Sequence, residues 1–363
     1  MRFPMRTAPI LAGLLAMAAS SARAQEGYVA PASVVSGMQG RQYSFERGLA
    51  TKWVRQFAFP GAVVFPVGQR LSVDIGSNYA VTTIKDSTGR ETTLSGFTDT
   101  QIRASYVFGK DAVVTTLLIN LPTGQKSDTS FLFGSIAGNF LLFPVNSYRN
   151  GASATGGLAA AFQMGGWNLG AAGSVRLNAE YKPFNGAAFK YKPGVEGRFR
   201  LGVDRLVGSS RLAVGFTYST FANDEGRSGT GAGTFQPGNR YIAEASLTTP
   251  VPGGSVTGYL WNFYRDSKST SSRQEDVLTG GVSANLSLGR GVGLEPAVEA
   301  KLWHPDQGRG NLLGVGTTLR LDLAPKLSFA PGGRFDFGRR RNGAANYSHI
   351  RGWQISGLLR YTI

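Results

Sequence analysis

The 363-residue chain has no cysteine and only two histidines, His304 and His349. Without cysteine, a disulfide scaffold is excluded. A metal site needs three or four converging ligands, and a hydrolase needs a nucleophile beside its base. His304 has only Asp306 near it in the sequence, and His349 has only Ser348. Neither pair supplies enough groups for a metal site or for the active site of a hydrolase. We therefore expect no metal, no cofactor and no enzymatic activity.

Long apolar runs are also missing. A membrane-spanning helix needs roughly 20 consecutive apolar residues, and the apolar run Ile10–Ala19 is shorter than that. This run follows Arg2 and Arg6 and precedes the small-x-small triplet Ala22-Arg23-Ala24. The pattern is typical of a secretory signal peptide. We expect residues 1–24 to be removed on export and Gln25 to begin the mature chain.

The chain is rich in glycine, aromatic residues and basic charge: it has 50 Gly, 22 Phe, 13 Tyr and a net charge of +16. The basic residues are dispersed, apart from the cluster Arg339-Arg340-Arg341. An exported basic protein meets lipopolysaccharide phosphates before it meets nucleic acid. The expected partners are therefore membrane lipid and lipopolysaccharide, and no nucleic acid.

Apolar and polar residues alternate along most of the chain. In Arg211–Phe221, for example, Leu212, Val214 and Phe216 share one face, while Ala213 and Thr217 share the other. Because successive side chains of a strand point to opposite faces, each such strand has one oily and one wet face. The wet face carries charges in mid-strand, and short turns alternate with long loops. These features predict an all-β transmembrane antiparallel up-and-down β-barrel of a bacterial outer membrane.

The alternation gives about fourteen strands, with twelve and sixteen left open. The predicted strands are 70–84, 98–108, 111–121, 156–164, 169–182, 195–207, 211–222, 240–249, 254–265, 277–289, 292–303, 311–323, 326–338 and 350–363. The barrel domain is assigned to residues 67–363. Residues 25–66 are expected to form either a plug in the lumen or an extra strand.

The last predicted strand ends the chain, with Trp353, Ile355, Tyr361 and Ile363 on one face. A terminal amphipathic strand with an aromatic residue near its end resembles the recognition signal of outer-membrane proteins, although Phe is the usual last residue there. The resemblance implies that the outer-membrane assembly machinery is a partner.

One stretch carries a more specific pattern. Gly96-Phe97-Thr98-Asp99 precedes two strands, Ile102–Phe108 and Val113–Asn120, which lead into Leu121-Pro122-Thr123-Gly124. This order resembles the outer-membrane transporters of the phenol meta-pathway family, which are similar to fatty-acid and aromatic-hydrocarbon transporters. The resemblance implies diffusion of small, fairly apolar organic molecules. Residues 25–66 lack the Asn-Pro-Ala triplet of the fatty-acid transporters, so a hatch is not implied. Taken alone, Pro122 and Gly124 indicate the exit of a strand.

Two groups of residues are candidates for the site. Basic and acidic residues are nearly balanced on the predicted inner face, which favours paired charges and weak ion selectivity. The lumen-wall candidates are Glu196, Arg198, Arg200, Asp204, Arg176, Glu180, Arg320 and Arg334. The long loop 122–155 contains an apolar part, which is unusual for a loop in water and indicates a lid or interaction site. The candidates for that mouth or lid are Phe131, Phe133, Phe140 and Phe143.

The sequence thus predicts a porin-like channel for passive diffusion of small organic solutes of apolar or aromatic character. Two alternatives remain: a structural or adhesive barrel with a sealed lumen, and an outer-membrane hydrolase.

Overall fold

The computed structural model describes residues 31–46, 51–109, 113–126, 143–228, 231–268, 274–305, 309–342 and 346–363. The predicted signal peptide lies outside these residues. Within them, no helix is long and apolar enough to cross a membrane.

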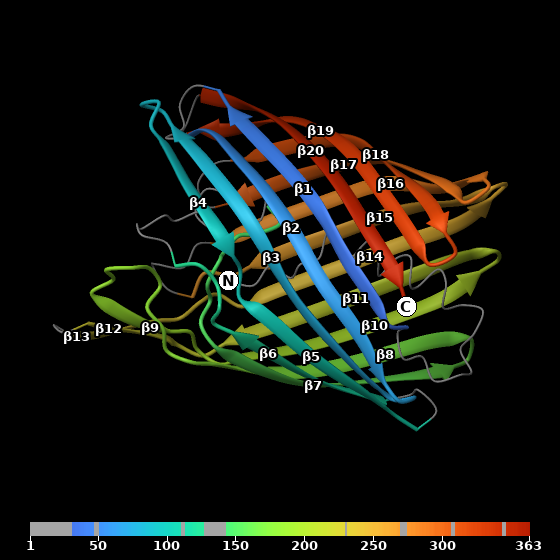
Figure 1. The fold of residues 1–363 in the computed structure, drawn as a ribbon, viewed down its shortest axis with the longest axis horizontal. Helices are drawn as coiled ribbons and strands as arrows, with labels where there is room; N and C mark the ends of the chain where they lie inside the picture. Colours follow the sequence, from blue (N-terminus) through green and yellow to red (C-terminus); the bar gives the residue numbers. More distant parts are fainter. Residues whose placement is uncertain are drawn as a thin grey trace.

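The protein is a closed antiparallel barrel of sixteen wall positions (Figure 1). Two short strands, β4 and β5, pair with successive parts of β3 and together fill one position. The wall strands are β1 (Ser33–Phe45), β2 (Thr51–Val67), β3 (Leu71–Asp86), β4 (Glu91–Phe97), β5 (Thr100–Phe108), β6 (Val113–Leu121), β7 (Ser153–Met164), β8 (Trp167–Asn178), β10 (Glu196–Val207), β11 (Ser210–Phe221), β14 (Arg240–Val251), β15 (Gly254–Arg265), β16 (Glu275–Gly289), β17 (Val292–Pro305), β18 (Gly310–Ala324), β19 (Leu327–Asn342) and β20 (Asn346–Thr362). A separate sheet of β9 (Phe189–Lys192), β12 (Asp224–Ser228) and β13 (Gly231–Phe235) lies in two of the long loops.

Neighbouring wall strands are joined by a local connection in the chain, with one exception. The exception is the seam, where β1 pairs with β20 from Ser33↔Thr362 to Phe45↔Ile350. Both ends of the described chain therefore lie at the same end of the barrel, as an even strand number requires. The short turns lie at that end. In one of them only Gly165 and Gly166 join two strands, with φ of 55° and 78°, values that glycine adopts without steric cost.

The preferred number of fourteen strands was too low, and sixteen, one of the numbers left open, is correct. The two missing strands are β1 and β2, so the described part of residues 25–66 belongs to the wall and is not a plug. In β2 apolar residues lie on both faces: Val54 and Ala58 are fully buried on the inner face, on either side of the polar Gln56, while Phe59 is exposed on the outer one. The alternation that marks the other strands is therefore hidden here.

The outer face of the wall is apolar and bounded by aromatic residues. Phe199 and Leu201 are exposed outward from the middle of β10. Near the end with the long loops, the rings of Tyr218, Tyr241 and Tyr264 follow one another across three strands, with centroids 5.2 and 5.8 Å apart. An apolar band flanked by aromatic rings on a closed barrel is the surface that lipid requires. The protein is a β-barrel of the bacterial outer membrane. In such barrels the long loops face outside and the short turns face the periplasm.

Candidate functional site

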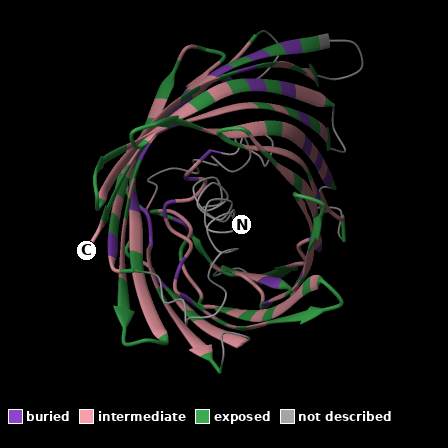
Figure 2. Cartoon of the chain, turned by 90° about the vertical axis from the view of Figure 1, so that its right-hand side faces the viewer, coloured by how far each residue is buried: buried purple, intermediate pink, exposed green. Residues whose placement is uncertain are grey.

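The wall strands form a ring when the barrel is seen from one end (Figure 2). The lumen inside this ring is the candidate site, because most of the polar side chains that the described residues bury have inward positions on the wall strands. One transverse row of directly opposed residues crosses seven neighbouring strands, and glycine occupies every second position in it. The row reads Tyr43, Gly352, Asp336, Gly314, Glu299, Gly281 and Tyr259, from β1 to β15.

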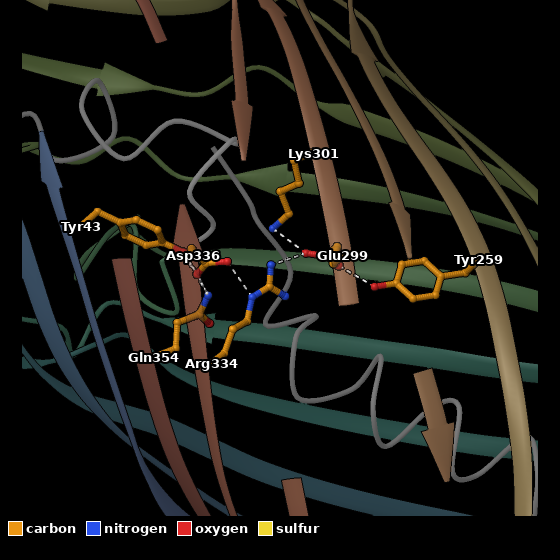
Figure 3. A network of polar contacts seen from close by, with 7 residues as sticks. All are labelled: Tyr43, Tyr259, Glu299, Lys301, Arg334, Asp336 and Gln354. Carbon is orange, nitrogen blue, oxygen red and sulfur yellow. Dashed lines mark hydrogen bonds and ion pairs between the residues drawn. The ribbon is translucent and has the colours of Figure 1, made fainter. Parts of the chain in front are cut away.

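The large side chains of this row interact across the glycines (Figure 3). The Tyr43 hydroxyl donates to Asp336 at 2.9 Å, and the Tyr259 hydroxyl donates to Glu299 at 2.7 Å. Arg334 joins the two carboxylates, at 2.7 Å from Asp336 and 2.9 Å from Glu299. Further donors complete the network: Lys301 at 3.1 Å from Glu299, and Gln354 at 3.0 Å from the Tyr43 oxygen. This network braces the wall from β1 to β15.

Glycine is required in this row for steric reasons. A Cβ placed on Gly314 would overlap the Arg334 guanidinium, and one on Gly281 would overlap the Tyr259 hydroxyl. Because neighbouring strands lie about 4.8 Å apart, a contact between alternate strands has to pass over the strand between them. The same arrangement recurs where Arg200 of β10 pairs with Glu244 of β14, over Gly215 of β11.

The four lumen-wall candidates on β10 all lie on its inner face, but they do not form one cluster. Glu196 and Arg198 pair with each other at 2.6 Å. Arg200 reaches Glu244, and Asp204 pairs with Arg211 at 3.0 Å. The group that was predicted to lie nearest a constriction is thus divided among three separate ion pairs, in each of which the two charges neutralise each other locally.

The other candidates are spread around the wall. Arg176 of β8 donates to the Ser153 hydroxyl at 3.1 and 3.0 Å, and Arg334 belongs to the bracing network. Arg320 lies over Gly293, near the short-turn end of β18. Glu180 lies outside the wall, since β8 ends at Asn178; it pairs with Lys190 of β9 at 3.0 Å in the loop sheet.

Several inward basic residues were missed by the sequence reasoning. Arg240 directly opposes Arg265 on the next strand, and Ser219 places Arg198 in the same transverse row. Counting in steps of two from Glu244 would have placed Arg240 on the inner face. The residues that the register adds to the inner face are Arg41, Arg211, Arg240, Arg265, Arg340 and Glu275. With these, the described wall strands carry more basic than acidic residues inward, so the expected balance of charge was wrong.

The described second part of the loop between β6 and β7, residues 143–152, lies against the inner face of β1–β3. Phe143 is buried with Tyr43, Val54 and Ile84, and its role as a lid stays a prediction. Phe131, Phe133 and Phe140 lie outside the described residues. The amide side chain of Gln56 pairs with the backbone of Val145 through both its oxygen, at 2.8 Å, and its nitrogen, at 2.6 Å.

Tyr148 holds the same loop. Its hydroxyl shares a hydrogen bond of 2.9 Å with Thr82 and donates one of 3.0 Å to the Leu94 carbonyl. Burial disfavours the charged phenolate and raises the pKa of Tyr148 to about 12.

Asp99 ties together the two ends of this loop. One carboxylate oxygen accepts from the backbone N–H of Gly124, and the other accepts from that of Asn150, at 2.9 and 2.7 Å. The Asn120 side chain donates to the second oxygen at 2.9 Å. Asp99 and Gly124 belong to the two halves of the pattern noted in the sequence. The fold brings those halves into contact, so the pattern marks a loop anchor as well as a strand exit.

The histidines take no part in the lumen. His304 and His349 have outward positions on β17 and β20, next to residues whose side chains point inward. Over the described ranges, no three His, Asp or Glu side chains converge as a metal site would require.

Neither a known protein family nor a curated protein matches the sequence, so the relation to the phenol meta-pathway family stays a prediction. Among solved structures, a mutant of the monoaromatic hydrocarbon channel TodX is similar, with 9% identity, coverage of 93% of this chain and 91% of that one, and a TM-score of 0.46. OmpT of Vibrio cholerae is 10% identical, with coverage of 93% of this chain and 99% of that one, and a TM-score of 0.42. An outer membrane channel of Pseudomonas putida F1 is 11% identical, with coverage of 92% of this chain and 97% of that one, and a TM-score of 0.40.

Proposed function

We propose that the protein is a passive outer-membrane channel for small organic solutes, and that it favours those with an aromatic ring and a negative charge. The observation that carries the proposal is the juxtaposition of arginines and aromatic rings on the inner face of β14 and β15. Arg240 and Arg265 face each other there, Arg265 is paired with Glu275 at 2.9 Å, and Trp261 and Phe263 follow on β15.

The size of the barrel supports a channel. Barrels of about eight strands are filled by their own side chains, whereas those with roughly 16 to 18 strands leave an aqueous passage. The inner wall of this barrel is polar, and its charges are largely paired, as in the network around Arg334 and Glu299. Such a wall keeps water and tolerates ions better than an apolar one does.

The charge and the rings support the choice of solute. An excess of one sign on a pore wall raises the local concentration of ions of the opposite sign. The half-buried ring of Trp261 stacks on the buried ring of Phe263, with centroids 6.1 Å apart, and the guanidinium of Arg240 lies 4.5 Å from the ring of Phe221. Apolar contact contributes about 25 cal/mol per Å² buried, so a small aromatic solute gains a few kcal/mol at most and can leave again.

The test measures ion selectivity and solute flux of the full-length protein in planar bilayers and liposomes. We expect anions to permeate better than cations, and benzoate to enter faster than an alkylammonium ion or a neutral sugar of similar size. Arg240→Gln should reduce the anion preference, while Trp261→Ser should slow benzoate more than chloride. Arg205→Gln, an outward substitution beside Trp167, is the control.

Two results would contradict the proposal. Equal flux of benzoate and the sugar in all variants would indicate a general porin. No conductance by the folded protein would favour the sealed, structural barrel.

A further inference from the structure

A hollow of about 250 Å³ lies on the outer face of the wall, toward the long-loop ends of β18, β19 and β20. Its lining includes Asn311, Phe337, Arg339, His349 and Arg351. Because the hollow is separate from the lumen, a ligand could bind there whether or not the barrel conducts solutes.

The basic residues of this hollow point outward. Arg339 directly opposes His349 on β20 and Asn311 on β18, and the next residues along, Gly338 and Ile350, have inward positions. Arg339, His349 and Arg351 are all exposed. They stand where the wall strands leave the apolar band and approach the loops.

Two contacts hold Arg339 in place. Its guanidinium lies 4.9 Å from the centre of the Tyr347 ring, and its backbone N–H donates to the Asn311 side chain at 3.1 Å. A guanidinium held near a ring by a cation–π contact still has N–H groups that can donate to a ligand. The nearby pair of Arg351 with Glu46, at 3.7 Å, is exposed and therefore weak.

Apolar residues adjoin the hollow on its lipid side. Phe337 is 51% exposed, and Phe335, two residues further into the membrane, is 72% exposed. The basic sector continues on β2, where the Arg55 guanidinium lies 5.1 Å from the ring of Trp53. Arg351 directly opposes Phe337 on the neighbouring strand, so this surface presents arginines beside aromatic rings.

The corresponding part of the wall on β15 and β16 has a different character. There Tyr264 and Asp276 are opposed on the outer face, and Asn262 donates to the Asp276 carboxylate at 2.7 Å. An acidic residue at this level repels anions. The basic character of the sector around Arg339 therefore does not extend to β15 and β16.

We propose that this sector, formed by Arg339, Arg351 and His349 together with Phe335 and Phe337, binds the phosphorylated headgroup of lipopolysaccharide. Arginine forms paired, charge-assisted hydrogen bonds with phosphate, which makes it the suitable residue type. The acyl chains of the same molecule would cover the phenylalanines. Lipopolysaccharide is the phosphorylated lipid of the outer leaflet, and the long-loop end of the barrel faces that leaflet.

The experiment measures binding of purified lipopolysaccharide to the full-length barrel in detergent. The double variant Arg339→Gln/Arg351→Gln is compared with Arg205→Gln, which removes an outward arginine near the short turns. We expect the double variant to bind about tenfold more weakly, and the control to bind as the parent does. Enzymatically dephosphorylated lipopolysaccharide should bind all three proteins equally weakly.

Equal binding by parent and double variant would overturn the proposal, as would equal loss in the control. Preference for phosphatidylglycerol over lipopolysaccharide would also overturn it, because the site would then be a general anionic-lipid surface. If the double variant fails to fold, Arg339→Lys provides the test: it keeps the charge but loses the planar fork, and it should weaken binding measurably.

Discussion

The hydroxyl of Tyr43 reaches Asp336 at 2.9 Å although a whole strand separates β1 from β19, and the residue between them is Gly352. The glycine removes the side chain that would block the contact. The wall is therefore braced between alternate strands in addition to the backbone hydrogen bonds between adjacent ones.

Gly314→Ala should weaken this bracing. The added methyl group would overlap the Arg334 guanidinium and move it away from Glu299. We expect a loss of about 1–3 kcal/mol in the free energy of unfolding, the usual effect of overpacking. Urea unfolding in detergent measures it. Gly202→Ala is the control, because its methyl group would meet only the Val214 carbonyl, at 3.9 Å; equal loss in both variants would contradict this role of glycine.

Asp99→Asn should release the loop between β6 and β7. An amide has only one accepting oxygen, so the backbone N–H of Gly124 or of Asn150 would lose its acceptor. Each hydrogen bond to a charged group contributes about 1.5–3 kcal/mol. We expect faster tryptic cleavage at Lys126 and a larger or noisier single-channel conductance. Asp224→Asn, which alters the Gly194 contact in another loop, should leave both unchanged.

Phe216→Arg and Ala213→Arg should differ in their effect on assembly. Phe216 is 41% exposed on the lipid face, where an arginine near the mid-plane costs about 2–4 kcal/mol. Ala213 lies inward between Asp204 and Ser246, where the new charge keeps water and an acidic neighbour. Heat-modifiable mobility in gels reports assembly, and similar damage by both substitutions would show that the two faces are wrongly assigned.

The loop should loosen at high pH through Tyr148. Its pKa is raised from 10.0 to about 12 because burial disfavours the phenolate. The stabilisation is therefore complete below about pH 10 and is lost as the pH rises toward 12. We expect the conductance of the parent to increase over this range. Tyr148→Phe should lack that step, and matching profiles for the two proteins would exclude Tyr148 as its source.

The sequence predicts those parts of the fold whose signal lies along one strand. In β11, the alternation of Leu212, Val214 and Phe216 is enough to assign a lipid face. In β2 it fails, because Val54 packs on the loop residue Phe143 and is apolar for that reason. The glycine row could not be found in this way, since Gly314 and Arg334 are neighbours only through the register of different strands.

In the candidate site, too, the features that lie along one strand could be predicted, whereas those that depend on contacts between strands could not. The inward direction of Arg198 and Arg200 could be predicted from the period of two, but their partners could not, because Glu244 is reached over a strand that intervenes in space. Asp99 was noticed only as part of a pattern. Its role depends on Asn150, which the chain reaches after the whole loop.

The seam between β1 and β20 has a consequence for the order of folding. The other wall strands pair with partners near them in the chain, so they can add to a growing sheet one after another. The seam instead joins residues as far apart as Tyr43 and Gln354, the first and last parts of the wall to leave the ribosome. Until it forms, the sheet has two free edges with unpaired N–H and C=O groups, which lipid cannot satisfy. Insertion into the bilayer and closure of the ring must therefore be coupled. A chain that lacks its first or its last wall strand cannot close this sheet in the same way, so the edges that the seam joins remain unpaired.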